Sequence, residues 1–213
     1  MALTDNNRTA FRAPGLAAVP RKALARLPEI HAESFETANL ARFLGSAVTA
    51  GAALTLLWTL ALIFAGGAGL QQEFAWSLLV LVGVGAMLRS HIKSTAQAFD
   101  RAPLRQSARD LRALLFYAGF AWGAGAFLLL GNNPVPIMGL CFAVLPSVLL
   151  PALLKDRAAS RNFIAPVTSL SAIAILLQPW GNAPLALAML LVVEGCVMAG
   201  LSLVRRPAGL SFR

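Results

Sequence analysis

Glu194 is the residue whose type and place in the sequence point most directly to chemistry. It is the one carboxylate in LLVVEGCVMAG, residues 190–200, and its apolar surroundings extend over residues 184–204, about the length that crosses a bilayer. An ionised carboxylate at mid-bilayer costs a few kcal/mol, roughly 2.5–3.5 on insertion scales, so we expect a neutral acid that both donates and accepts hydrogen bonds. Such a group serves as a proton, cation or ligand site, or as a structural acid bonded to a neighbouring helix, and the sequence leaves both open.

Glu194 has few companions in the membrane. No other Asp, Glu, Lys, Arg or His falls within an apolar segment, whereas a proton relay or an ion-coupled carrier usually contains several such groups. The hydroxyl side chains expected at a compatible depth are Thr55, Ser169 and Ser171.

Small residues mark two segments where helices could approach closely. One set surrounds the acid at Gly195, Ala199 and Gly200, and a GxxxG pair is formed by Gly119 and Gly123. Such faces support packing inside the chain or homodimerisation. Tyr117 and Trp122, in the same segment as the GxxxG pair, are candidates for lining a pocket, with packing as the alternative.

Other catalytic and metal-binding chemistry is not indicated. Cys141 and Cys196 lie in apolar segments without a C-x-x-C partner, and His31 and His91 are far apart in the sequence. There is no nucleophile motif, phosphate loop or H-E-x-x-H motif. We therefore expect no cofactor, no metal site and no enzymatic activity. A membrane enzyme acting on lipids is the weakest alternative, because the acids in the polar loops show no metal-ligand spacing; these are Asp100, Asp110 and Asp156.

The composition indicates that membrane helices position these residues. The chain has 213 residues, of which 58% are hydrophobic and 13% charged, about half the charged fraction of a soluble domain, and its mean hydropathy is +0.70. Backbone groups in lipid must be satisfied within each segment, which favours helices, and the alternation of a membrane barrel is absent. The apolar segments are residues 43–64, 74–88, 114–130, 134–154, 163–180 and 184–204. The sequence predicts an all-α, polytopic protein with six transmembrane helices.

The distribution of charge predicts the orientation. Six Lys or Arg residues precede the first span, six lie in residues 89–112, and three each lie in residues 155–162 and 205–213, which accounts for all 18. With six spans every one falls on the same side, and the positive-inside rule makes that side cytoplasmic. Both termini are then cytoplasmic. The net charge of +9 is explained by topology and anionic lipid headgroups, so nucleic acid is not expected as a partner.

Three regions follow from this layout. Residues 1–41 form a cytoplasmic tail, residues 42–204 the six-helix transmembrane domain, and residues 205–213 a short cytoplasmic tail. No apolar signal-peptide core occurs in residues 1–25. We expect a juxtamembrane helix from Pro28 into the first span, or alternatively a helix lying on the membrane surface. Trp76 and Trp180, near span ends, are expected in the interfacial belt.

Two stretches resemble a known type of sensor. They are RAPLRQSARDLRALLFYAGFAWGAGAFLLL, residues 101–130, and RNFIAPVTSLSAIAILL, residues 161–177. From about residue 40 onward the layout resembles the six-helix, MASE-like membrane sensor regions that precede diguanylate cyclase or histidine kinase domains in bacteria. The resemblance implies a multi-pass signal-input module with both ends inside, and brings no ligand residues. Since no output domain follows the last span in this sequence, we expect either a sensor acting through a separate partner or a shared architecture alone.

The leading hypothesis from the sequence is a non-enzymatic membrane module of the bacterial inner membrane. It would take part in regulation or signal transduction, or assemble with a protein partner or a second copy, through its basic cytoplasmic face. The alternative is a small transporter or channel that uses Glu194.

Overall fold

The computed structural model describes residues 21–65, 69–96, 101–131, 136–154, 156–178 and 182–203 of the chain, without the side chains of residues 21–32 and of a few helix ends. All regular structure in these residues is helical. The helices are α1 (Arg21–Ala65), α2 (Leu70–Ala96), α3 (Arg101–Ala124), α4 (Ala126–Gly131), α5 (Pro136–Leu154), α6 (Arg157–Leu177) and α7 (Ala183–Leu203).

Six segments of this described structure are long and apolar enough to cross a membrane. Helices α3 and α4 together form one of them, Ala102–Gly131, and the other helices supply one each. The chain is thus an all-α, multi-pass membrane protein, as the apolar segments predict. The span predicted at residues 163–180 is displaced, because α6 begins already at Arg157 and ends at Leu177.

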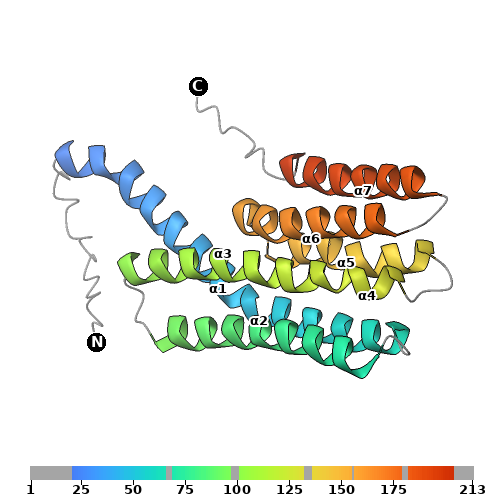
Figure 1. Ribbon diagram of the computed structural model, residues 1–213. Coiled ribbons are helices and arrows are strands. Elements are labelled where there is room, and N and C mark those ends of the chain that lie inside the picture. Colours follow the sequence, from blue (N-terminus) through green and yellow to red (C-terminus); the bar gives the residue numbers. More distant parts are fainter. Residues whose placement is uncertain are drawn as a thin grey trace, which may run out of the picture.

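The successive spans run alternately in opposite directions (Figure 1). The cations of the described residues therefore gather at one end of the bundle. We call this the basic end: α1, α3 and α6 begin there, and α2, α5 and α7 end there. The Lys and Arg side chains that the structure describes all lie toward it; they are Arg42, Arg89, Lys93, Arg105, Arg109, Arg112, Arg157 and Arg161.

Helix α3 occupies the centre of the bundle, between α2 on one side and α6 on the other, while α7 lies at the edge (Figure 1). The most extensive helix pair is α3 with α6, followed by α2 with α3, whereas α7 packs mainly on α6 and α5. Among the six spans α7 is the least buried. The larger of two apolar clusters joins helices α1 to α6, and the smaller one includes Leu190 of α7.

The α3–α6 contact depends on the absence of two side chains. A Cβ atom on Gly119 would lie 2.3 Å from the Phe163 carbonyl oxygen, and one on Gly123 would lie 3.0 Å from the Pro166 carbonyl oxygen. Backbone therefore meets backbone, the arrangement that small residues permit in membranes. The GxxxG pair of the sequence is used here for packing within the chain.

A tryptophan interrupts the third span where the sequence predicts one continuous helix. The indole of Trp76 donates to the Ala121 carbonyl oxygen at 3.0 Å, the acceptor that the Gly125 amide would use in an α-helix. That amide bonds to the Trp122 carbonyl oxygen at 2.9 Å instead, and the ring occupies the space that a Gly125 Cβ would need. Trp76 is 4% exposed and stacks edge-on against Trp122 at 5.6 Å, so the expectation that it lies in an interfacial belt is wrong. Trp180 lies outside the described residues.

Helix α1 extends well beyond its membrane span at the basic end (Figure 1). It begins at Arg21 rather than at Pro28 and continues unbroken into the span, so the predicted helix joins the first span directly. The Arg105 guanidinium of α3 braces this extension, with hydrogen bonds of 2.8 Å to both carboxylate oxygens of Glu36.

A second ionic contact fixes the start of α6. Asp156 caps the helix by accepting the Ala159 amide at 2.8 Å and pairs with the Arg112 guanidinium at 3.0 Å. The Arg112 side chain also lies over the Phe43 ring, 5.5 Å from its centroid. Helices α1, α3 and α6 are thereby joined near the basic end.

The α3–α6 contact predicts opposite effects of the same substitution at two glycines. Gly119→Ala forces a Cβ against the α6 backbone, and we expect a loss of about 1–3 kcal/mol in the free energy of unfolding, as in an overpacked core. Gly195→Ala is the matched control, because open space surrounds Gly195 and alanine gains about 0.5–1 kcal/mol in a helix. Unfolding of the purified protein in detergent measures both. Equal stability of the two variants would contradict the close contact.

Candidate functional site

The structure places Glu194 inside the bundle, on the face of α7 that packs on α5 and α6. The residue is 5% exposed, and neither carboxyl oxygen has a hydrogen-bond partner among the described residues. Leu190, one turn earlier on α7, is fully buried in the cluster that contains Ala143 of α5 and Ile175 of α6. This face of α7 is therefore the one that attaches the last span to the rest of the chain.

Hydroxyl groups from both neighbouring helices face the carboxyl. Ser147 of α5 and Thr168 of α6 lie close enough to interact with it, although neither makes a hydrogen bond of good geometry with it. Ser171, one turn beyond Thr168 on α6, is also fully buried, and its hydroxyl has no partner among the described residues. We call Ser147, Thr168 and Glu194 the polar cluster.

The Ser147 hydroxyl lacks a hydrogen-bond partner because its usual acceptor is occupied. A serine in a helix commonly donates to the carbonyl four residues earlier, which here is that of Ala143. That oxygen already accepts the indole N–H of Trp122 at 3.1 Å in addition to its helical amide. The hydroxyl of Ser147 is thus left for the interface with α7. Thr168 differs, because its hydroxyl donates to the Ile164 carbonyl oxygen at 3.0 Å.

The three hydroxyl side chains expected near Glu194 lie in different surroundings. Thr55 of α1 donates to the Gly51 carbonyl oxygen at 2.9 Å, and α1 is not among the main neighbours of α7. Ser169 lies on an exposed side of α6 and donates to Ala165 at 2.8 Å. Ser171 is on the buried side of α6.

Sequence reasoning did not single out Ser147 or Thr168. Depth could not select among hydroxyls while the helix neighbours of α7 were unknown. The usable signal for Thr168 is its spacing from Ser171, since residues three apart share a helix face. No comparable signal identifies Ser147, because the tryptophan that occupies its usual acceptor belongs to another helix.

The two glycines near the acid have open space around them. A Cβ on Gly195 or Gly200 would meet nothing within 4 Å, and Ala199 is exposed as well. The expectation of a close neighbouring helix on this face is therefore not met within the described chain, because α5 and α6 contact the opposite, Glu194-bearing side of α7.

The aromatic pair considered as a pocket lining is used in packing. Trp122 is 1% exposed and is held by its bond to Ala143. Tyr117 is half-buried, and its ring packs against Gly83 of α2. A Cβ atom on Gly83 would lie 3.5 Å from that ring. Among the described residues no three His, Cys, Asp or Glu side chains come together in a group that could hold a metal ion.

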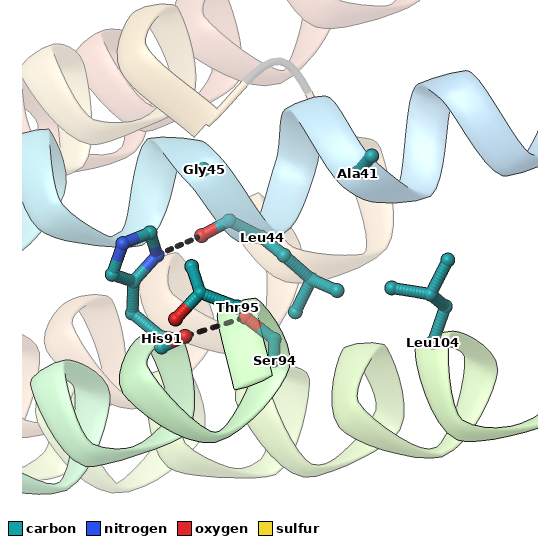
Figure 2. A pocket seen from close by; sticks show the side chains of 7 residues that line it. All are labelled: Ala41, Leu44, Gly45, His91, Ser94, Thr95 and Leu104. Carbon is teal, nitrogen blue, oxygen red and sulfur yellow. Dashed lines mark hydrogen bonds between the residues drawn. The ribbon is translucent and has the colours of Figure 1, made fainter. Parts of the chain in front are cut away.

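A pocket of about 240 Å³ lies at the basic end, lined by residues of α1, α2 and α3 and by none of α7 (Figure 2). The residues that line it are Ala41, Leu44, Gly45, His91, Ser94, Thr95 and Leu104. The polar side chains of the pocket form hydrogen bonds with nearby backbone atoms. His91 Nδ1 lies 3.2 Å from the Leu44 carbonyl oxygen. The Ser94 hydroxyl donates to the His91 carbonyl oxygen at 2.7 Å. This pocket offers little to a polar ligand.

No protein-family model, curated protein or solved structure matches the chain. The resemblance to membrane sensor regions therefore stays a prediction from the residues.

The polar cluster predicts how Glu194 tolerates substitution. Glu194→Gln keeps the shape and a neutral side chain that donates and accepts, so we expect the free energy of unfolding to change by less than about 1 kcal/mol. Glu194→Lys places a cation at the same depth without a counter-charge, and we expect a loss of about 3 kcal/mol. Thermal unfolding in detergent compares the two variants. A lysine variant as stable as the wild type would show that this side of α7 is open.

Proposed function

We propose that this protein is a non-enzymatic module of the bacterial inner membrane that assembles with a second protein at its basic end, which faces the cytoplasm. The observation that carries the proposal is the continuation of α1 and α3 beyond their apolar segments at this end. Such extensions are not needed to cross the bilayer, and the Arg105–Glu36 contact fixes one against the other. Together they form a platform at the basic end, which we place on the cytoplasmic side of the membrane.

The charge of the platform indicates the chemistry of the partner. Arg105 and Arg109 on α3 and Lys93 at the end of α2 are exposed, and each lies beyond the apolar part of its helix. An acidic protein surface complements them, and such contacts accelerate and orient association. The positive-inside rule supports a cytoplasmic location for this end. Phe35 on the α1 extension is 69% exposed and supplies an aromatic anchor of the kind enriched at interfaces.

The platform also suits a regulatory role. Because α1 is unbroken, a displacement of its span is carried directly to Phe35 and Glu36. This arrangement supports the signal-input reading that the resemblance to sensor regions implies. The output would be delivered to the partner protein.

Assembly at the basic end predicts that a charge reversal there breaks a complex, whereas an acidic residue introduced at the opposite end leaves it intact. Arg109→Glu should lower the yield of an acidic partner co-purified in mild detergent by about tenfold or more, since a lost charge pair at an interface costs roughly 2 kcal/mol or more. Gln72→Glu, exposed at the opposite end of α2, is the matched control and should retain the partner. Quantitative mass spectrometry of the purified complexes measures both.

Two outcomes contradict this assembly. In one, Arg109→Glu retains the partner as well as Gln72→Glu does. In the other, the protein isolates alone and its deletion leaves every membrane complex intact, in which case the exposed cations serve anionic lipid headgroups.

A second candidate function is a small transporter or channel, favoured by the unpartnered carboxyl of Glu194 among hydroxyl groups. It predicts that Glu194→Gln abolishes a proton- or cation-dependent flux into proteoliposomes. Ser169→Ala, on the exposed side of α6, should leave that flux unchanged. Flux that survives the glutamine substitution removes this candidate.

A further inference from the structure

Two groups of the polar cluster are buried without a hydrogen-bond partner in the described structure. They are the Ser147 hydroxyl and the Glu194 carboxyl, of which both oxygens are unpartnered. A buried polar group without a partner costs about 1–3 kcal/mol, and two such groups close together at one helix junction require an explanation. Both belong to the contact of α7 with α5 and α6.

No charge on the neighbouring helices compensates an ionised Glu194. The titratable or charged residue within the described part of α5 is Cys141, which is exposed. On α6 they are Arg157 and Arg161, both exposed near the start of the helix at the basic end, and on α7 itself Cys196 is exposed. A carboxylate here would be buried and unpaired, at a cost of several kcal/mol.

The hydroxyl groups show which protonation state completes the cluster. The hydrogen of Thr168 is already donated to Ile164, so toward Glu194 this hydroxyl presents lone pairs, which would repel a carboxylate. A protonated carboxyl instead donates to Thr168. Ser147 keeps its own hydrogen, because its usual helical acceptor is taken by Trp122, and donates it to the other carboxyl oxygen.

We propose that Glu194 is a proton-binding site and that its resident proton fastens α7 to α5 and α6. The bound proton forms a hydrogen bond from Glu194 to Thr168, and the carboxyl accepts one from Ser147. One neutral acid thereby satisfies groups on two other helices. The proposal is independent of assembly at the basic end. It would give the transport candidate its ligand, but it concerns binding, which is measured without any flux.

Infrared difference spectroscopy on the full chain in lipid nanodiscs tests the site directly. The spectrum of the wild type minus that of Glu194→Gln should contain the carbonyl stretch of a protonated carboxylic acid at neutral pH. The band should disappear reversibly when the pH is raised. The glutamine variant is a suitable reference because it keeps the shape and hydrogen-bonding capacity of the neutral acid.

Variants of the hydroxyl groups test the hydrogen bonds. Ser147→Ala removes a donor to the carboxyl, and Thr168→Val removes the acceptor of its proton while preserving volume. Either should shift the acid band to higher frequency, because a carboxyl that loses a hydrogen bond stiffens. Ser169→Ala, next to Thr168 but on the exposed side of α6, should leave the band unmoved.

Three outcomes overturn the proposal. Carboxylate bands in place of the acid band at neutral pH show that Glu194 is ionised. Loss of the acid band when sodium replaces choline at constant pH shows a sodium site instead of a proton site. An acid band that none of the hydroxyl variants shifts shows that the carboxyl does not bond to Ser147 or Thr168.

Discussion

The close approach of α3 and α6 is the contact on which the rest of the bundle depends. In lipid there is no hydrophobic drive between helices, so association relies on packing and on hydrogen bonds. Gly119 and Gly123 bring the two backbones together where any side chain would collide with Phe163 or Pro166. This contact fixes α6 against the central helix α3, and α7 docks on α6 and α5. The Arg112–Asp156 pair anchors the same two helices near the basic end.

Tryptophan side chains couple this centre to its surroundings through hydrogen bonds as well as through packing. The Trp76 indole donates to the Ala121 carbonyl oxygen, and α3 ends early at this point. The Trp122 indole donates to the Ala143 carbonyl oxygen of α5. Each of these two indole N–H groups is satisfied by a carbonyl of a neighbouring helix. Because Trp122 occupies the Ala143 carbonyl oxygen, the Ser147 hydroxyl does not bond to it and stays available at the contact with α7. The surroundings of Glu194 are thus set partly by a residue of α3 that is not among the side chains facing the acid.

The sequence predicts the architecture well because hydropathy and length control it. The six spans and the common location of the basic segments follow from the distribution of apolar and basic residues along the sequence. The ends of helices differ from the predicted ones, as at Arg21 and Arg157.

The site is less predictable. The isolation of Glu194 in the sequence marks it as unusual, but its neighbours depend on which helices pack together. Ser147 was not identified because a hydroxyl that bonds its own helix and one that faces a neighbour look alike in a sequence. The small residues of α7 failed as a guide for a related reason: Gly195 and Ala199 lie on the side opposite the contact.

The edge location of α7 has a consequence for biosynthesis. Helix α7 leaves the ribosome after α5 and α6, which can already have paired in the membrane by then. The acidic side chain of Glu194 therefore enters the bilayer beside a preassembled surface that contains Ser147 and Thr168. Were α5 and α6 to pair late, the acid would have to reside in lipid, where such segments insert poorly. The timing of synthesis thus favours a chain order in which the span with the acid comes after the helices that shelter it.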